Sequence, residues 1–187
     1  EAAANLVYGG GLTIYTLMDT DVQTVIERYF RNLAHFDNAA DMDYAITVVD
    51  PRNGALLGIV GNKGEKTANR VLNYAADALL PPGSALKPLS VYAPALEEGL
   101  ITWSSVFDDT PAQFTKTADG YRMWPRNASR IYSGLTTAAD ALAFSKNTVA
   151  VKILDKVGLN RSYRYLTENF GLYGLVEKEN DENGNFY

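Results

Sequence analysis

The sequence contains no cysteine and only one histidine, His35, among its 187 residues. The lack of cysteine excludes disulfide bonds, thiolate nucleophiles and cysteine-based metal sites. A single histidine cannot form a multi-histidine metal site, and it makes a histidine-based catalytic triad a poor expectation. His35 follows a predicted helix and is expected to be structural. Any catalysis is therefore expected to use hydroxyl, amine, amide or carboxyl groups.

Long apolar runs and an excess of positive charge are also lacking. No run approaches the ~18 residues that are needed to cross a bilayer. The net charge of −5 disfavours a nucleic-acid partner, because no basic face dominates. No basic and apolar leader opens the chain, so we expect any export or anchoring segment to have been removed. A hydrophobic content of 47% is typical of a folded chain with a sizeable core.

Turn residues and apolar spacing predict the elements of the first half. Residues 1–8 are interpreted as a linker remnant, and residues 12–16 alternate as a short strand does. Asp19 or Thr20 is expected to cap a helix that runs to about residue 33. The predicted apolar face of this helix consists of Val22, Val25, Ile26 and Tyr29.

A hairpin is predicted next. Two runs rich in β-branched residues, 45–50 and 55–61, are joined by a turn that contains Asn53 and Gly54, a strong hairpin signal. Residues 63–80 are less regular, with a possible helix in their second half.

The second half is predicted to be mainly helical. Residues 84–98 form a predicted helix that Pro94 should kink. Residues 101–132 show no sustained period and are expected to be a functional loop or an extended cover over a cleft. Further helices are predicted at residues 136–144, 147–157 and 160–170, before a polar terminus at 180–185.

Ser84 and Lys87 are three residues apart at the start of the predicted helix 84–98. This spacing places a hydroxyl and an amine on one side of a helical turn, with Cβ atoms roughly 5–6 Å apart. A neutral lysine this close can take the proton of the serine and make it a nucleophile. The pair therefore indicates acyl-transfer chemistry. The structural alternative is a capping serine beside a solvated lysine.

Ser145, Lys146 and Asn147 lie at a predicted break between two helices. Ser145 could pass a proton between Lys87 and a leaving group, and the Asn147 amide could hold a substrate amide with its paired donor and acceptor. The alternative is again helix capping by Ser145 or Asn147. Lys146 has no role that the sequence reveals.

The two motifs, in this order and about sixty residues apart, resemble the transpeptidase domain of penicillin-binding proteins, and of the bifunctional, class A members in particular. The resemblance covers residues 9–174. The similar segments are residues 10–14 with Asp19, 49–55, 69–70, 82–88, 91–92, 95–97, 124–127, 132–134, 141–143 and 145–151.

The resemblance implies an α+β fold, an α/β/α sandwich with an antiparallel sheet and a helical subdomain, over residues 9–187. It also implies roles for the motif residues. Ser84 would be the acylated nucleophile, Lys87 its general base, Ser145 a proton relay, and Asn147 the residue that positions the substrate. It implies no metal and no organic cofactor.

One family motif is absent. Nothing after residue 148 supplies the Lys-Thr-Gly strand that normally follows the second motif, and Lys66-Thr67-Ala68 and Lys116-Thr117-Ala118 precede it and lack the glycine. We therefore expect a truncated, inactive N-terminal portion whose C-terminal strands are missing. The rest of the domain would be its natural partner. An exposed sheet edge is expected to make this portion pair with another copy or rearrange.

The resemblance implies a peptidoglycan D,D-transpeptidase that acts on D-Ala-D-Ala stem peptides and is acylated by β-lactams. Its parent would be anchored in the membrane of a bacterial cell, with this domain on the extracytoplasmic face. The alternatives within the superfamily are a D,D-carboxypeptidase and a β-lactamase. A non-catalytic β-lactam-sensing or scaffold module is the alternative from another class.

Overall fold

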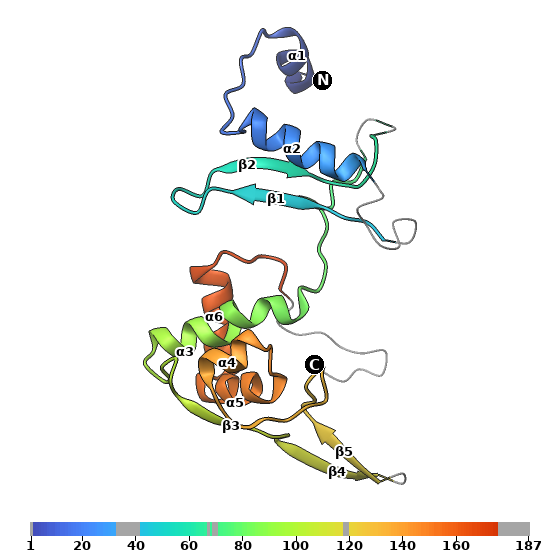
Figure 1. The fold of residues 1–187 in the computed structure, drawn as a ribbon. Helices are drawn as coiled ribbons and strands as arrows, with labels where there is room; N and C mark the ends of the chain where they lie inside the picture. The colour runs from blue at the N-terminus through green and yellow to red at the C-terminus, as the bar shows by residue number, and fades with distance from the viewer. Residues whose placement is uncertain (1, 33–41, 67, 69–70, 118–119, 176–187) are drawn as a thin grey trace. The chain divides into compact units, whose positions relative to one another are not determined.

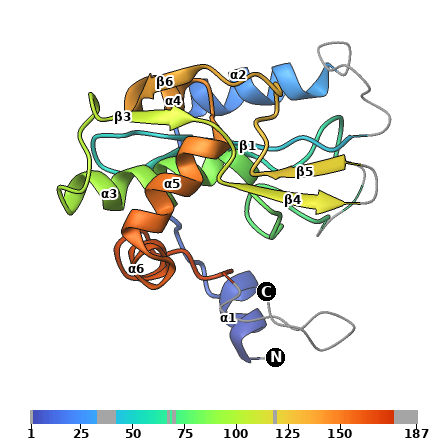
Figure 2. The ribbon, with the colours of Figure 1, turned by 90° about the horizontal axis from the view of Figure 1, so that it is seen from below.

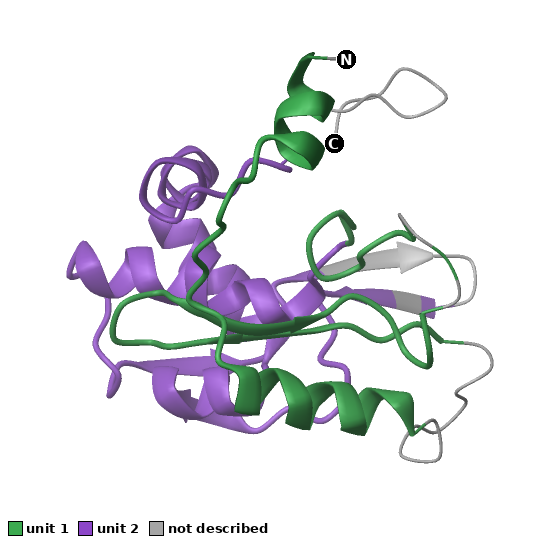
Figure 3. Cartoon of the chain, turned by 90° about the horizontal axis from the view of Figure 1, so that it is seen from above, with its two compact units in different colours: residues 1–80 green, residues 81–187 purple. Residues whose placement is uncertain are grey.

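The computed structural model describes residues 2–32, 42–66, 68, 71–117 and 120–175 (Figure 1). Two compact units make up the chain, Glu1–Leu80 and Pro81–Tyr187, which are green and purple in Figure 3. His35 and the polar terminus predicted at residues 180–185 lie outside the described residues. Each unit has its own helices and its own antiparallel strand pairs.

The first unit begins with two helices, α1 (Ala2–Gly9) and α2 (Thr20–Arg31). The Asp19 carboxylate accepts hydrogen bonds from the N–H groups of Asp21 and Val22, at 2.9 and 3.1 Å. These bonds satisfy two of the N–H groups that a helix start leaves unpaired. The predicted helix is confirmed, with Asp19 rather than Thr20 as its cap.

The predicted hairpin is confirmed as β1 (Ile46–Val49) and β2 (Leu56–Val60). The strands are antiparallel, and their register sets Ile46 opposite Val60. In the turn, the N–H of Gly54 donates to the Asp50 carbonyl at 2.8 Å. Gly54 has φ +73, which a residue with a side chain adopts only with strain.

The apolar face of α2 differs from the predicted one. Val22 and Ile26 are partly buried and Phe30 is buried, whereas Val25 and Tyr29 are 61% and 49% exposed. The helix packs on β2, and Gly58 permits the close approach: a Cβ there would lie 2.9 Å from Ile26 Cδ1. The face of α2 that is turned toward the protein interior therefore consists of Val22, Ile26 and Phe30, which are four residues apart, and not of the predicted set.

Two other predictions for this unit are wrong or changed. Residues 12–16 form no strand, and Ile14 and Tyr15 are 79% and 91% exposed. Alternation makes a strand only where a partner strand pairs its backbone groups, and the described residues supply none. The expected linker remnant, residues 1–8, lies mostly in α1, whose residues are all exposed, and its role as a linker stays a prediction. The possible helix before residue 80 is only a turn at residues 74–77.

The second unit opens with a continuous helical stretch of three kinds. η2 (Gly83–Leu86) is a 3₁₀ turn, η3 (Pro88–Tyr92) is π-helical, and α3 (Ala93–Glu97) is α-helical. The Ala93 N–H donates to the Pro88 carbonyl, five residues back, and Pro94 has no N–H to donate. The helix predicted at residues 84–98 is thus confirmed, with its irregularity in the turn before Pro94.

Strands occupy much of residues 101–132, which are predicted to be irregular. β3 (Val106–Asp109) pairs with β6 (Gly134–Thr137), and β4 (Gln113–Thr117) pairs with β5 (Gly120–Trp124). Each strand has only four or five residues, too few to show a period of two clearly. The helix predicted from residue 136 begins two residues later, because β6 includes Thr136 and Thr137.

Three α-helices complete the second unit: α4 (Ala138–Ala143), α5 (Asn147–Val157) and α6 (Leu159–Arg164), followed by η4 (Tyr165–Asn169). Helix α5 contacts α3, α4, η3 and β3 (Figure 2). The buried core joins these elements and consists of Val91, Tyr92, Ala95, Ile101, Ala138, Ala141, Val149, Ala150, Ile153 and Val157. This core fixes the start of α5 relative to the stretch that carries Ser84 and Lys87.

Candidate active site

Ser84 lies in η2, and its side chain is exposed. Gly83, just before it, has φ +57, so the sharp turn into the helical stretch depends on glycine. The Ser84 carbonyl accepts the Lys87 N–H, which closes the 3₁₀ turn. Within the described residues the Ser84 hydroxyl makes no hydrogen bond, to Lys87 or to any other group. The oxygen of the predicted nucleophile is therefore open to an incoming molecule.

Lys87 faces the second motif. Its Nζ donates hydrogen bonds to Ser145 Oγ at 3.0 Å, to the Ser145 carbonyl at 2.8 Å and to Asn147 Oδ1 at 2.5 Å. These residues are about sixty positions away in the sequence, and the core between α5 and η3 brings them together. Three of the four predicted site residues thus meet at one nitrogen, and the fourth, Ser84, lies in the adjoining turn.

The surroundings of Lys87 suit a lysine that changes protonation state. An ammonium group has three N–H donors, and the three oxygens around Nζ match them. Burial lowers the pKa of Lys87, because a partly desolvated amine holds its charge less well. Once one proton is lost, a hydroxyl such as that of Ser145 can turn its hydrogen toward the free lone pair.

Ser145 sits in a left-handed conformation, with φ +52. The Ser145 N–H donates to the Leu142 carbonyl at 2.9 Å, and the Lys146 N–H to the Ala141 carbonyl at 2.8 Å. This pair of bonds is a Schellman motif that ends α4, and glycine is the usual residue at the position of Ser145. A side chain there costs on the order of 1–2 kcal/mol, and such strain is concentrated at functional sites.

Asn147 is the first residue of α5, and both ends of its amide are engaged. Oδ1 accepts from Lys87, while Nδ2 donates to the Arg126 carbonyl at 2.7 Å. The two bonds fix which way the amide faces. Its oxygen is directed at Lys87 and its nitrogen at the loop after β5.

A buried polar cluster lies beside the motif, and sequence reasoning missed it. Asp109 is 0% and Lys146 7% exposed, and Lys146 Nζ lies 2.8 Å from Asp109 Oδ2. Asn127 and Thr148 complete the cluster as further donors to Asp109 Oδ1, with Asn127 Nδ2 at 2.7 Å. In the sequence, the segment 124–127 is marked only by its family likeness, and nothing local marks Asp109 as a partner of Lys146.

The Asp109 carboxylate is ionised. Burial acts to raise its pKa, but hydrogen bonds from Lys146, Thr148, Asn127 and the Ser133 N–H outweigh burial and hold the pKa of Asp109 well below its usual range. Lys146 Nζ also donates to Ser133 Oγ at 2.8 Å. Both partners of this ion pair are therefore satisfied inside the protein.

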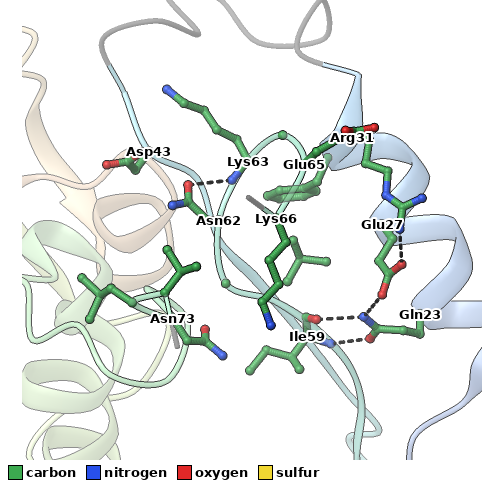
Figure 4. A pocket seen from close by; sticks show the side chains of 16 residues that line it. Gln23, Glu27, Arg31, Asp43, Ile59, Asn62, Lys63, Glu65, Lys66 and Asn73 are labelled. Carbon is green, nitrogen blue, oxygen red and sulfur yellow. Dashed lines mark hydrogen bonds and ion pairs between the residues drawn. The ribbon is translucent and has the colours of Figure 1, made fainter. Parts of the chain in front are cut away.

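A separate pocket of about 580 Å³ lies in the first unit (Figure 4). The Gln23 amide spans one wall: its Oε1 accepts the Ile59 N–H at 2.9 Å, and its Nε2 donates to the Ile59 carbonyl at 3.0 Å. Glu27 and Arg31 form an ion pair at 3.0 Å on the same side. Among the described residues, no serine, threonine or cysteine lines this pocket.

In the described part of the chain, no group of three or more histidine, aspartate or glutamate side chains is arranged to hold a metal ion. Within the same residues, no helix combines the length and the apolar content of a membrane span.

Comparison with known proteins gives one family. A model of the penicillin-binding protein transpeptidase domain matches residues 44–185. Penicillin-binding protein 1A of Clostridium botulinum strain Langeland is 36% identical over 179 residues, which are 90% of this chain and 21% of the relative. The protein of the same name from Clostridium perfringens strain 13 is 32% identical over 93% of this chain and 27% of its own length. The chain spans about a fifth to a quarter of the length of these relatives.

Solved structures agree with this fold. The crystal structure of penicillin-binding protein 1A from Haemophilus influenzae matches 70% of this chain and 19% of its own, with a TM-score of 0.59 and 30% identity. The PonA1 protein from Mycobacterium tuberculosis in complex with penicillin V matches 96% of this chain and 45% of its own, with a TM-score of 0.69. At 20% identity this second match supports the fold alone. The mixture of helices and antiparallel strands and the family match together show that the chain belongs to the penicillin-binding protein transpeptidase family.

Proposed function

We propose that the chain is part of a peptidoglycan D,D-transpeptidase in which Ser84 is the acylated nucleophile and Lys87 its general base. The observation that carries the proposal is the contact of Lys87 Nζ with Ser145 and Asn147, because it joins both motifs at one point. The names of the relatives, and the penicillin V held by the PonA1 protein, support the same activity.

Acylation would begin with neutral Lys87. Its lone pair takes the hydroxyl proton of Ser84 as Ser84 Oγ attacks the carbonyl between the two terminal D-alanines. Ser145 Oγ, at 3.0 Å from Lys87 Nζ, passes the proton to the departing amine. The C–N bond breaks, free D-alanine leaves, and Ser84 holds the rest of the peptide as an ester.

Transfer reverses the proton path. An amine of a neighbouring stem peptide attacks the ester carbonyl, gives its proton back through Ser145 and Lys87, and releases Ser84. A β-lactam would acylate Ser84 in the same way, but its leaving amine stays attached to the acyl group. Asn147 would hold the amide of the peptide or the lactam side chain, with its own orientation fixed by the Arg126 carbonyl.

The location follows from the substrate. Stem peptides lie outside the cytoplasm, so we place this domain, from residue 9 onward, on the extracytoplasmic face of the bacterial membrane, with residues 1–8 as a connecting segment. Residues 148–187 contain no Lys-Thr-Gly sequence, which in this family contributes to the oxyanion site. We therefore expect the 187-residue chain alone to be acylated far more slowly than the full-length protein.

The test is labelling of the full-length protein with a fluorescent penicillin. Wild type should form a stable adduct, and Ser84→Ala should form none. Ser90→Ala is the matched control, because its hydroxyl lies in the same helical stretch and bonds the Leu86 carbonyl. It should label like wild type.

Other results would change the assignment. Fast release of the label would indicate a β-lactamase, and release of D-alanine without cross-linking a carboxypeptidase. A folded wild type that takes no label would indicate a non-catalytic module, and labelling that survives Ser84→Ala would remove Ser84 as the nucleophile.

A further inference from the structure

A buried ion pair lies directly behind the second motif. Asp109 ends β3, Lys146 stands between Ser145 and Asn147, and the two are 0% and 7% exposed. Within the described residues, neither side chain makes a hydrogen bond or an ion pair with Lys87 or Ser84. Burying two charges costs much of what their attraction returns, so such a pair is weak evidence for a role in stability alone.

Asp109 uses both carboxylate oxygens to hold separate segments. Oδ1 accepts from Asn127 Nδ2 at 2.7 Å and from Thr148 Oγ1. Oδ2 accepts from Lys146 Nζ and from the Ser133 N–H, both at 2.8 Å. A single fixed group thus connects the loop after β5, the segment before β6 and the first turn of α5.

Asn127 links Asp109 to the start of α5. Its Oδ1 accepts the N–H of Asn147 at 2.8 Å and the N–H of Thr148 at 3.3 Å. The N-cap residue of α5, Lys146, makes no side-chain cap bond of its own. Asp109 Oδ1 and the Ile131 carbonyl, at 3.0 Å, both accept from Asn127 Nδ2, so the oxygen of this amide, and not its nitrogen, meets the helix.

Lys146 links Asp109 to the backbone of the second motif, Ser145 to Asn147. Its side chain is drawn inward to Asp109 and Ser133, which fixes the backbone between Ser145 and Asn147. The two neighbours then present Oγ and Oδ1 to Lys87. The middle residue of the motif is therefore an anchor, and the outer two are the groups that meet Lys87.

We propose that Asp109 is a positioning residue for acylation: through Lys146 and Asn127 it sets where Ser145 Oγ and Asn147 Oδ1 stand relative to Lys87. This inference rests on the proposed function, since it concerns the acylation of Ser84. Misplacement by about 1 Å at a reacting centre costs roughly a hundredfold in rate, so the effect should be kinetic even where the fold survives.

The experiment measures acylation of the full-length protein by a fluorescent penicillin, with the dissociation constant and the acylation rate constant separated by varying the penicillin concentration. Asp109→Asn keeps the shape and removes the charge. We expect its acylation rate constant to fall by about 10- to 100-fold while the dissociation constant changes less than about threefold. Asp108→Asn is the matched control, because Asp108 is the exposed neighbour in the same strand. It should acylate like wild type.

A cycle of variants separates positioning from general loss of structure. If Asp109 acts through Asn127, the double variant Asp109→Asn with Asn127→Ala should fall little further than the lower of the two single variants. If the fold-losses in rate constant of the two single variants multiplied in the double variant, Asp109 would not act through Asn127. Lys146→Met leaves Asp109 with three donors, so it remains informative if Asp109→Asn does not fold. Its acylation should be slowed about threefold to tenfold, and an unchanged rate constant would overturn the proposal.

The outcomes distinguish this inference from the proposed function. Wild type that is labelled at Ser84, together with a folded Asp109→Asn variant of unchanged rate constant, overturns only the role of Asp109. Wild type that takes no label overturns both. A lower rate constant with a dissociation constant near that of wild type, measured at a temperature where Asp109→Asn is still folded, supports the positioning role.

Discussion

Helices α2 and α5 both begin at a side-chain oxygen that accepts backbone N–H groups, but the oxygens come from different distances along the chain. For α2 the oxygen belongs to Asp19, the residue before the helix. For α5 it belongs to Asn127, twenty positions before Asn147. The first helix end is held locally, and the second is held by a loop that also reaches the buried Asp109.

The difference separates a helix start that serves folding from one that also holds reacting groups. A local cap leaves the helix free to move as a unit with its own cap. A cap from a distant loop fixes the helix start in space, and the start of α5 carries the groups that meet Lys87. Variants at the start of α2 should therefore change stability alone, whereas variants at the start of α5 should change both stability and the acylation rate.

The largest effect is expected from the group that the start of α5 faces. Lys87→Met removes the proposed base, and acylation of the full-length protein should fall by about 10²- to 10⁴-fold. In wild type the rate constant should rise with pH, because the neutral amine is the reactive form. Since burial lowers the pKa of Lys87, this rise should come below the usual lysine range. The measurement is the acylation rate constant between neutral and alkaline pH.

Lys156→Met is the control for the Lys87 prediction. Lys156 is exposed in the last turn of α5, at the end away from the site. Its loss should leave both the rate constant and its pH profile as in wild type. Lys87 would not be the base if the acylation rate constant of wild type did not change with pH, or if its rise with pH persisted in Lys87→Met.

Removal of each cap tests the comparison directly. Asn127→Ala leaves the N–H groups of Asn147 and Thr148 unpaired in the interior and removes one of the two donors to Asp109 Oδ1, which should cost on the order of 3 kcal/mol and slow acylation. Asp19→Ala removes an exposed cap and should cost about 1 kcal/mol with no change in acylation. Thermal unfolding of both variants, together with their labelling rates, checks this. Equal kinetic effects of the two caps would contradict it.

Local features were predictable from the sequence because their causes lie within a few residues. The Asp19 cap, the turn at Gly54 and the end of α5 at residue 157 are all predicted in this way. The buried face of α2 could not be predicted in this way. The helix has apolar residues on two adjoining sides, and only its contact with Gly58 determines which side is buried. Strands β3 and β6 were missed because each is short and its partner is more than twenty residues away.

The candidate site divides in the same manner. Motif spacing and family likeness named Ser84, Lys87, Ser145 and Asn147, and the structure brings the last three together. Their roles remain proposals. Asp109 and its link to Lys146 could not be inferred, because no local pattern distinguishes a buried aspartate from the exposed Asp108 beside it. Residues that hold a site in position are determined by the three-dimensional fold more than by sequence spacing.

Acid should reduce the stability that the Asp109 carboxylate gives to the start of α5. The folded-state pKa of Asp109 lies below its unfolded value of about 3.9, so its contribution to stability is fully present above that value and is lost as the pH falls through the folded pKa. The difference in melting temperature between wild type and Asp109→Asn should therefore be large at pH 7 and shrink in strong acid. A constant difference across the pH range would show that charge is not what Asp109 contributes.

The smallest effect is expected at Ser145, where stability and function should change in opposite directions. Glycine adopts φ +52 without the strain that a side chain brings, so Ser145→Gly should raise the melting temperature by a few degrees, equivalent to about 1 kcal/mol. Ser145→Ala keeps the strain and should gain nothing. Both lose the hydroxyl that Lys87 contacts, so both should be acylated slowly. If glycine gave no more stability than alanine, the left-handed backbone would not be strained. If either variant kept the wild-type rate, the hydroxyl would not be the proton relay, and the strain at the end of α4 would need another reason.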